Sequence, residues 1–165
     1  MTPMIVAEIG GNHLGSLQRA LDLIVEANRA GADAVKFQCF LPDQMADPGV
    51  KIESGPWAGR DLLDLYRETH TPRKWFAKLF AGTRACGMTP FASVFHPDDV
   101  DFLETLDCPI YKISSFELTD LPLIRYAAKT GKRIIISTGM ATKAEIFDAV
   151  VAAGGDKGAP RLPTL

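Results

Sequence analysis

Two lysines stand out because each lies inside a short apolar run, where a charge is expensive. Lys36 stands in the string AVKF and Lys112 stands in the string IYKI. A buried ammonium group must be neutralised by a carboxylate or by an anionic ligand. Structural carboxylates such as Glu8 or Glu117 would meet this need, and so would a phosphate or carboxylate ligand in a cationic pocket. The two lysines alone leave both interpretations open.

Polar residues recur at the ends of the other apolar runs. Each of five runs carries a polar or charged group at or near its C-terminal end. The carboxyl ends of parallel strands share one edge of a sheet, and active sites lie there. This repetition favours one ligand site, with hydroxyl groups as further hydrogen-bond donors. The groups are Glu8, Lys36, Gln38, Ser93, Lys112, Ser114, Ser115, Ser137 and Thr138.

The histidines and glycines add two site candidates but no nucleotide-binding motif. Asn12 and His13 follow the first apolar run in a glycine-containing loop, so both are further site candidates. His70 and His96 lack ligand-type spacing to another histidine, cysteine or acid, and we interpret them as structural or exposed. The sequence contains neither a GxGxxG fingerprint nor a GxxxxGK[ST] loop, so these motifs give no support for a dinucleotide or P-loop nucleotide site.

The elements that must position these residues alternate between short apolar runs and segments of helical period. This alternation predicts an α/β fold with a parallel sheet whose two faces are covered. A connection at 41–60, rich in Pro, Gly and Asp, is long enough to suggest a functional loop. We expect strands at 4–9, 34–39, 88–93, 110–114 and 133–138, helices at 17–30, 61–69, 73–86, 97–106, 120–129 and 142–153, and a sixth strand beginning at 162–165.

Two architectures fit this order of elements. One is a five-stranded doubly wound sheet of the flavodoxin type, which would be complete in itself. The other is a truncated eight-stranded barrel, a fold that normally needs about 250 residues. Periodicity does not separate them.

Composition narrows the class of protein. A net charge of -2 over 165 residues gives no electrostatic case for nucleic acid or an anionic membrane. No apolar stretch reaches the ~20 residues of a membrane helix, and the N-terminus lacks the basic region of a signal peptide. We expect a cytoplasmic protein whose three cysteines are reduced structural thiols.

Several strings resemble the sialic acid synthase family, in order along nearly the whole chain. The likeness is strongest to the pseudaminic acid synthase branch, through GPWAGRDL, HTP and KISSFE at 55–62, 70–72 and 112–117. The strings shared with the wider family are AEIG at 7–10 with Asn12-His13, GADAVKFQ at 31–38, YKI at 111–113 with Ser115, and ISTGM at 136–140.

The resemblance implies an incomplete parallel (β/α) TIM-type barrel with five to six of eight units. Residues 1–165 would be its N-terminal portion, because family members are about twice as long. The later barrel units and a small antifreeze-like domain would be absent. The implied reaction condenses phosphoenolpyruvate with an amino-sugar aldehyde, of the 6-deoxy-AltdiNAc or ManNAc type. It would give a nonulosonic (pseudaminic or sialic) acid and phosphate.

The resemblance also implies roles for single residues. Gln38 would face the sugar and Glu8 would be the acid/base group. A divalent metal, Mn or Mg, would polarise the aldehyde, but its histidine ligands in the family lie on later strands and none is expected in this chain. The residues implied to hold the phosphate and carboxylate of phosphoenolpyruvate are Lys36, Ser93, Lys112, Ser115 and Ser137.

Other functions stay open at this point. The chain could be a barrel aldolase with a Schiff-base lysine at Lys36 or Lys112, or an inactive fragment that binds anions or sugars. Five units of a barrel leave an unpaired strand edge and exposed helix faces. We therefore expect the chain to be inactive alone, and to act as a homo-oligomer or together with the missing C-terminal half.

Overall fold

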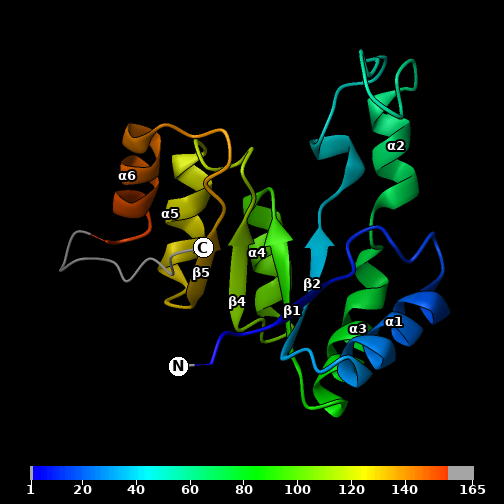
Figure 1. Ribbon diagram of the computed structural model, residues 1–165. Coiled ribbons are helices and arrows are strands. Elements are labelled where there is room, and N and C mark those ends of the chain that lie inside the picture. The colour runs from blue at the N-terminus through cyan, green and yellow to red at the C-terminus, as the bar shows by residue number, and fades with distance from the viewer. Residues whose placement is uncertain (1, 156–165) are drawn as a thin grey trace.

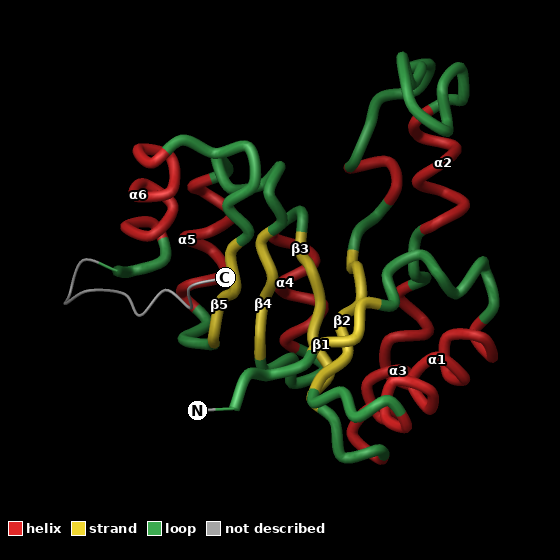
Figure 2. The backbone as a smooth tube through the Cα atoms, in the orientation of Figure 1, coloured by secondary structure: helices red, strands yellow, loops and turns green. Residues whose placement is uncertain are grey.

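The computed structural model describes residues 2–155, which form one parallel sheet with helices between its strands. Figure 1 shows the path of the chain, and the element type along it is coloured in Figure 2. The five strands lie in the order in which they occur along the chain. They are β1 (Val6–Glu8), β2 (Ala34–Cys39), β3 (Thr89–Val94), β4 (Ile110–Ile113) and β5 (Arg133–Ile136).

The helices begin at polar caps that the sequence supplies. Ser16, Asp61 and Asp120 each accept a hydrogen bond from a backbone N–H of the first turn, and Thr142 forms a capping box with Glu145. The helices are α1 (Leu17–Arg29), α2 (Leu62–Thr69), α3 (Arg73–Ala85), α4 (Pro97–Glu104), α5 (Leu121–Lys129) and α6 (Lys143–Ala152), with a 3-10 helix η1 (Pro42–Gln44).

Strand order decides between the two architectures. Successive strands are neighbours throughout, and every described pair is parallel. Right-handed crossovers between successive neighbours place all the connecting helices on the same side of the sheet. A doubly wound sheet instead needs a reversal of strand order to cover both faces. The described chain is therefore part of a barrel wall, with β1 and β5 at its two edges.

The core lies between the central strands and the helices behind them. Phe37 of β2 packs against Phe76 and Phe80 of α3, with ring centroids 6.2 Å and 5.9 Å apart. All three side chains are fully buried. Since successive residues of a strand point to opposite faces, Lys36 and Gln38 lie on the other face of β2.

Strand register places further polar side chains on the same face of the sheet as Lys36 and Gln38. Glu8 is paired with Lys36, Gln38 is paired with Ser93, and Ser93 is paired with Lys112. Register partners share a face, so these five side chains lie on the side away from the packed helices. Ser137 follows β5 two positions after Ile135, the partner of Lys112, and by alternation belongs to the same side.

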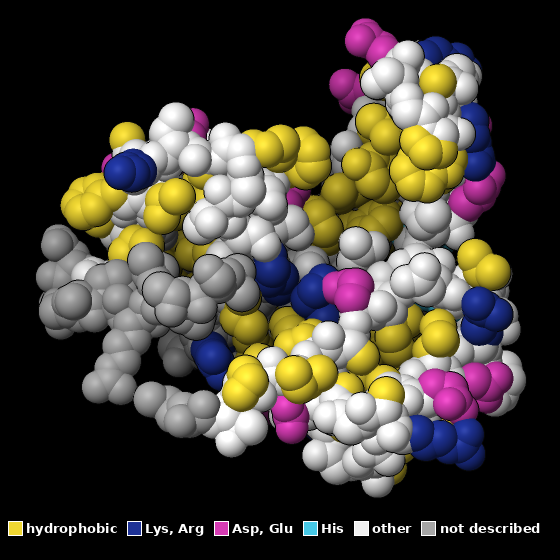
Figure 3. Space-filling view, in the orientation of Figure 1, with side chains coloured by type: hydrophobic (Ala, Val, Ile, Leu, Met, Phe, Trp, Pro, Cys, Tyr) yellow, Lys and Arg dark blue, Asp and Glu magenta, His cyan; other side chains and the backbone are white. Residues whose placement is uncertain are grey.

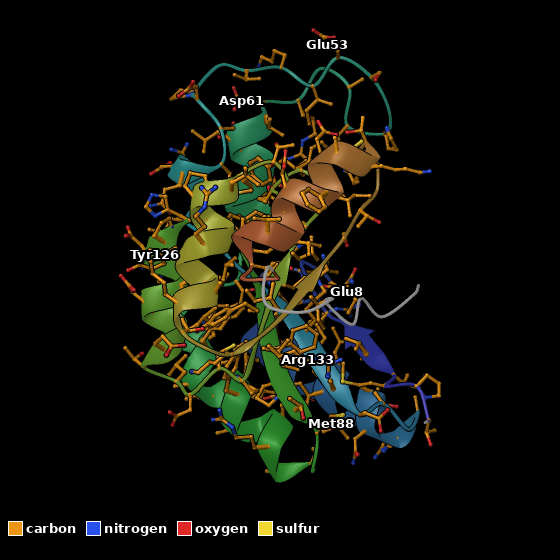
Figure 4. All side chains as sticks on the ribbon, turned by 90° about the vertical axis from the view of Figure 1, so that its left-hand side faces the viewer. Glu8, Glu53, Asp61, Met88, Tyr126 and Arg133 are labelled. Atoms are coloured by element: carbon orange, nitrogen blue, oxygen red, sulfur yellow. The ribbon has the colours of Figure 1, made fainter. Side chains whose placement is uncertain are left out.

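The 41–60 connection is ordered and lies beyond the carboxyl ends of the strands. An isolated antiparallel bridge joins Lys51 and Asp61, and the backbone N–H of Leu62 donates to the carbonyl of Val50 at 2.8 Å. In Figure 4, Glu53 and Asp61 lie at one end of the molecule and Met88, before β3, lies near the other. The connection and α2 thus project past the mouth of the sheet.

Most of the predicted elements are confirmed, with shifts at their ends. The second strand has the predicted bounds, whereas the first is confined to Val6–Glu8, half the predicted length. The segment 162–165, predicted to begin a sixth strand, lies outside the described residues. None of the described helices combines the length and apolar character needed to cross a bilayer.

Candidate active site

Lys36 lies at the centre of a cluster of polar side chains. Its side chain is 16% exposed, and its Nζ forms an ion pair with the Glu8 carboxylate. The same Nζ donates a hydrogen bond to Ser93 Oγ at 3.3 Å. Lys36 is therefore neutralised by a structural carboxylate, which is the first of the two interpretations given for the buried lysines. We call Glu8, Lys36, Ser93 and Lys112 the lysine cluster.

Lys112 stands in a different environment. Its Nζ donates to the carbonyl of Ile113 at 2.6 Å, and no ion pair to a carboxylate is found for it within residues 2–155. Burial lowers its pKa from 10.5 to about 8, and repulsion from Lys36 acts in the same direction. Glu117 and Glu8 oppose this shift but do not cancel it. An anionic ligand at this position would stabilise the charged form of Lys112, whose described hydrogen bond goes only to a backbone carbonyl.

Glu117 is the residue that the sequence alone did not assign to the site. The pattern indicated only a structural counterion, yet one carboxylate oxygen, Oε2, is buried without a hydrogen-bond partner. Burial raises the pKa of Glu117, while Lys112 lowers it less strongly. A buried acceptor without a donor is costly, which favours a ligand hydroxyl or amide as its partner. The sequence feature that could have identified Glu117 is its position two residues after Ser115, beyond the C-terminal end of β4.

Gly10 allows two of the predicted site residues to approach each other. A Cβ at this position would lie 3.0 Å from Glu8 Oε1 and 3.5 Å from Gln38 Oε1. Its φ of +45° is also a conformation that favours glycine. The Glu8 and Gln38 side chains therefore meet over Gly10, beside Lys36.

Ser93 is placed by its register pairs on both neighbouring strands, and the turn after β3 is held by a buried carboxylate. Asp99, which is fully buried, accepts the backbone N–H groups of Phe95 and His96 at 3.1 Å and 3.0 Å. Asp99 also forms an ion pair with Arg73 at 2.9 Å, which ties this turn to α3. Ser93 itself is 1% exposed, so its hydroxyl is held where Lys36 reaches it.

Two further serines follow the next strands. A Cβ on Gly139 would lie 3.2 Å from Ser115 Oγ, so the loops after β4 and β5 touch at this point. The backbone N–H of Ser137 donates to the carbonyl of Ile113 at 3.0 Å. Both serines are half-buried and lie beside the strand that carries Lys112.

Asn12 and His13 are placed differently. His13 Nδ1 accepts the backbone N–H of Gly15 at 3.1 Å, so its Nε2 carries the proton and donates to Thr71 Oγ1 at 3.2 Å. Burial lowers its pKa, as does the nearby His70, and the neutral ring is favoured. Asn12 is exposed, and its carbonyl accepts a hydrogen bond from Arg19. The described contacts join neither side chain to the lysine cluster.

An aromatic group lies beyond the strand ends. Phe40, directly after β2, packs edge-on against Tyr66 of α2 and Phe95, with ring centroids 5.6 Å apart in each case. Burial raises the pKa of Tyr66, and the charge of Glu117 adds to this shift. Figure 3 shows basic and acidic side chains together at the centre of the hollowed face, with hydrophobic side chains along its upper rim.

Comparison with known proteins identifies the family. The model of the NeuB family matches residues 23–160. The chain belongs to the NeuB family. Over 147 residues it is 42% identical to the pseudaminic acid synthase of Campylobacter jejuni, a match that covers 87% of this chain and 43% of that enzyme. The predicted family is therefore confirmed.

Two further relatives widen the comparison. The N,N'-diacetyllegionaminic acid synthase of Campylobacter jejuni is 34% identical over 153 residues, with 89% of this chain and 45% of that enzyme covered. A crystal structure of N-acetylneuraminic acid synthetase from Leptospira borgpetersenii superimposes with a TM-score of 0.81 at 30% identity. It covers 93% of this chain and 50% of that one, which confirms the α/β parallel barrel class. The chain thus spans about half the length of these relatives.

Proposed function

We propose that this NeuB-family chain forms the phosphoenolpyruvate-binding half of a nonulosonic acid synthase. The observation that carries the proposal is the lysine cluster. Lys36 Nζ donates to Ser93, and Lys112, the register partner of Ser93 on the next strand, has a backbone carbonyl as its described hydrogen-bond partner. Phosphoenolpyruvate carries a phosphate and a carboxylate on adjacent positions, and two separate cations match two separate anions.

A relative supports an anionic ligand. The Leptospira synthetase is described as a complex with citrate, a molecule with several carboxylates. In this chain, Lys36, Lys112 and the hydroxyls of Ser93, Ser115 and Ser137 are the groups proposed to hold phosphoenolpyruvate. Ser93 already accepts from Lys36, so its own proton is available to a ligand oxygen.

We propose that the reacting carbons lie near Glu8, the carboxylate paired with Lys36. C3 of phosphoenolpyruvate attacks the aldehyde carbon, water adds to the resulting oxocarbenium carbon, and phosphate leaves. Glu8 is the proposed acid/base group for these proton transfers. An anion at Lys36 would replace Glu8 as its partner and so release the carboxylate. Gln38 and Glu117 offer hydrogen bonds to the sugar.

The family resemblance implies a divalent metal, so we ask whether the described side chains include a suitable set of ligands. Among residues 2–155, no group of three or more His, Cys, Asp or Glu side chains is arranged to hold a metal ion. The described residues therefore do not fit a divalent metal. We propose that the described residues bind the anionic substrate and move protons beside it.

The proposal also covers the sugar substrate and the assembly in which the chain acts. We propose an N-acetylated amino-sugar aldehyde as the second substrate, with the precursor of pseudaminic acid as the first candidate; the 42% identity to a pseudaminic acid synthase supports this choice. Residues 1–165 act as the N-terminal portion of a cytoplasmic synthase that works as a homo-oligomer or with the rest of its barrel. The chain by itself binds without catalysing.

Calorimetric titration of the 165-residue chain with phosphoenolpyruvate tests the proposal, together with an assay for released phosphate in the presence of N-acetylmannosamine. We expect saturable binding of one equivalent and no turnover. Absence of binding at millimolar ligand would overturn the assignment. Steady release of phosphate in the presence of the sugar would overturn the claim that the chain is inactive alone.

A second candidate function has one observation in its favour. Because the pKa of Lys112 is about 8, part of its amine is neutral near physiological pH and can act as a nucleophile. A Schiff-base aldolase would form an imine between Lys112 and pyruvate, with loss of water. Borohydride trapping followed by mass spectrometry distinguishes the two functions, since the synthase reaction predicts no pyruvyl adduct.

A further inference from the structure

The turn after β4 buries one apolar side chain and exposes another. Leu118 is fully buried, while Phe116, two residues earlier, is 81% exposed. The turn is held by hydrogen bonds from the backbone N–H of Glu117 to Ser114 and from that of Asp120 to Glu117, at 3.2 Å and 3.0 Å. With its backbone fixed in this way, the turn holds Phe116 between Ser115 and Glu117, two residues of the candidate site.

The neighbouring loop presents a second exposed apolar side chain. Met140 is 76% exposed and has a φ of +66°, a left-handed conformation that is uncommon for residues other than glycine. Such backbone conformations cluster at ligand sites, where the surrounding structure holds them in place. Gly139, directly before it, is the residue that touches Ser115. The loops that carry Phe116 and Met140 are therefore in contact beside the candidate site.

We propose that Phe116 and Met140 form an apolar wall that recognises the acetamido methyl group of the sugar substrate. This inference rests on the proposed function and names the residues that select its second substrate. The lysine cluster holds the charged substrate, and the sugar carbon that reacts with it must lie within bonding reach. The remainder of the sugar then extends over the loops after β4 and β5, where the wall lies.

The chemistry of the wall matches an acetyl group better than a hydroxyl group. An aromatic ring and a thioether offer dispersion contacts and an apolar surface but no hydrogen bond for a hydroxyl. Glu117 Oε2, buried and without a partner, can accept the amide N–H of the same acetamido group. One substituent would then meet an acceptor at its N–H and an apolar surface at its methyl.

Saturation-transfer NMR on the 165-residue chain, with phosphoenolpyruvate present, tests the wall. N-acetylmannosamine and mannose are the probes, because they differ at the position of the acetamido group and neither is charged. We expect the acetyl methyl to receive the strongest saturation, and N-acetylmannosamine to bind about tenfold more tightly than mannose. In Phe116→Ala this preference should fall about tenfold, and in Met140→Ala by about threefold.

Phe147→Ala is the matched control, because this phenylalanine on α6 is 67% exposed and lies outside the site. It should leave the preference unchanged, and none of the three variants should change phosphoenolpyruvate affinity by more than about twofold. Equal sugar preference in Phe116→Ala and Phe147→Ala would overturn the inference, as would wild-type chain that binds phosphoenolpyruvate but no acetamido sugar. If wild type binds the sugar through Phe116 but binds no phosphoenolpyruvate, the wall stands and the proposed function fails.

Discussion

The central strands and the edge strands of this sheet are built differently. β2 and β3 share six register pairs, and from Thr89 to Val94 only the first residue of β3 is not buried. β1 has three residues, of which Glu8 is exposed, and every residue of β5 is half-buried or exposed. The candidate site spans both regions, since Lys36 and Ser93 lie on the central strands while Glu8 and Ser137 lie at the edges. The centre of the site therefore lies on strands with a paired neighbour on both sides, whereas its edge residues lie on or after strands with only one described neighbour.

Removal of a side chain from the centre should have the largest effect on stability. Phe37→Ala deletes a ring packed between Phe76 and Phe80, and should lower the free energy of unfolding by about 3–5 kcal/mol. Ile135→Ala, on the half-buried edge strand, should lower it by only about 1–2 kcal/mol. Urea denaturation followed by circular dichroism measures both. Equal losses would remove the distinction between centre and edge.

The next largest effect is expected on the affinity for phosphoenolpyruvate. Lys36→Met or Lys112→Met should weaken phosphoenolpyruvate binding by roughly 10–100-fold, because each removes a charge-assisted hydrogen bond of about 1.5–3 kcal/mol. Titration calorimetry measures the change. Lys78→Met is the matched control, since this exposed lysine on α3 points away from the cluster and should bind as wild type does. Loss of affinity in the control equal to that in the cluster variants would mean that general charge, not the cluster, attracts the ligand.

The pH dependence of binding should follow Lys112. With a pKa of about 8, Lys112 loses its proton as pH rises, so affinity should fall about fivefold between pH 8 and pH 9. Lys112→Arg keeps its charge across this range and should show no such fall. Titrations at half-unit steps from pH 7 to pH 9 are the measurement. The same slope in wild type and Lys112→Arg would assign the pH dependence to another group.

The same pKa also affects stability, with a defined sign. Between about pH 8 and pH 10.5 the unfolded chain binds more protons at Lys112 than the folded chain does. The free energy of unfolding therefore gains a contribution that rises with pH in this window. Urea midpoints of wild type minus those of Lys112→Met should increase from pH 8 to pH 10. A constant difference would show that burial does not perturb this group.

The smallest effect is expected at the edge. The Glu8 side chain is 45% exposed, and partly exposed ion pairs contribute about 0.2–1 kcal/mol. Glu8→Gln removes the anion that an incoming phosphate must displace from Lys36, so phosphate affinity should rise by about 1.5–5-fold. Calorimetry with inorganic phosphate measures it. A decrease in affinity would mean that Glu8 orients Lys36 for the ligand, not that it competes with the ligand.

The sequence predicted the parts of the fold that depend on local patterns. The run from Ala34 to Cys39 is bounded by clear signals and has the predicted bounds. The first strand is shorter than its apolar run, because pairing with β2 is described for Val6 to Glu8 alone. Periodicity did not choose between a barrel and a doubly wound sheet, since strand order depends on contacts between distant segments.

In the candidate site, too, local patterns were predictable and contacts between distant segments were not. Residue types in the strands indicated which side chains could bind an anion, and the register then placed Gln38, Ser93 and Lys112 in one row. The sequence named Glu8 and Glu117 as possible counterions, but it could not tell that Glu8 pairs with Lys36 while Lys112 donates to a backbone carbonyl, because this depends on side-chain reach in three dimensions. Glu117 was indistinguishable from an ordinary counterion until its buried oxygen was found without a donor. The substrate-binding roles of these residues remain predictions.

A crystal structure of this chain with phosphoenolpyruvate would show whether the lysine cluster binds the ligand. We expect one ligand molecule on the open face, with its phosphate and carboxylate oxygens within about 3.2 Å of Lys36 Nζ and Lys112 Nζ. Ser93 Oγ should contact the same ligand, and Glu8 should have left Lys36. A ligand bound elsewhere, or an unchanged Lys36–Glu8 pair with Lys112 still on the Ile113 carbonyl, would contradict this expectation.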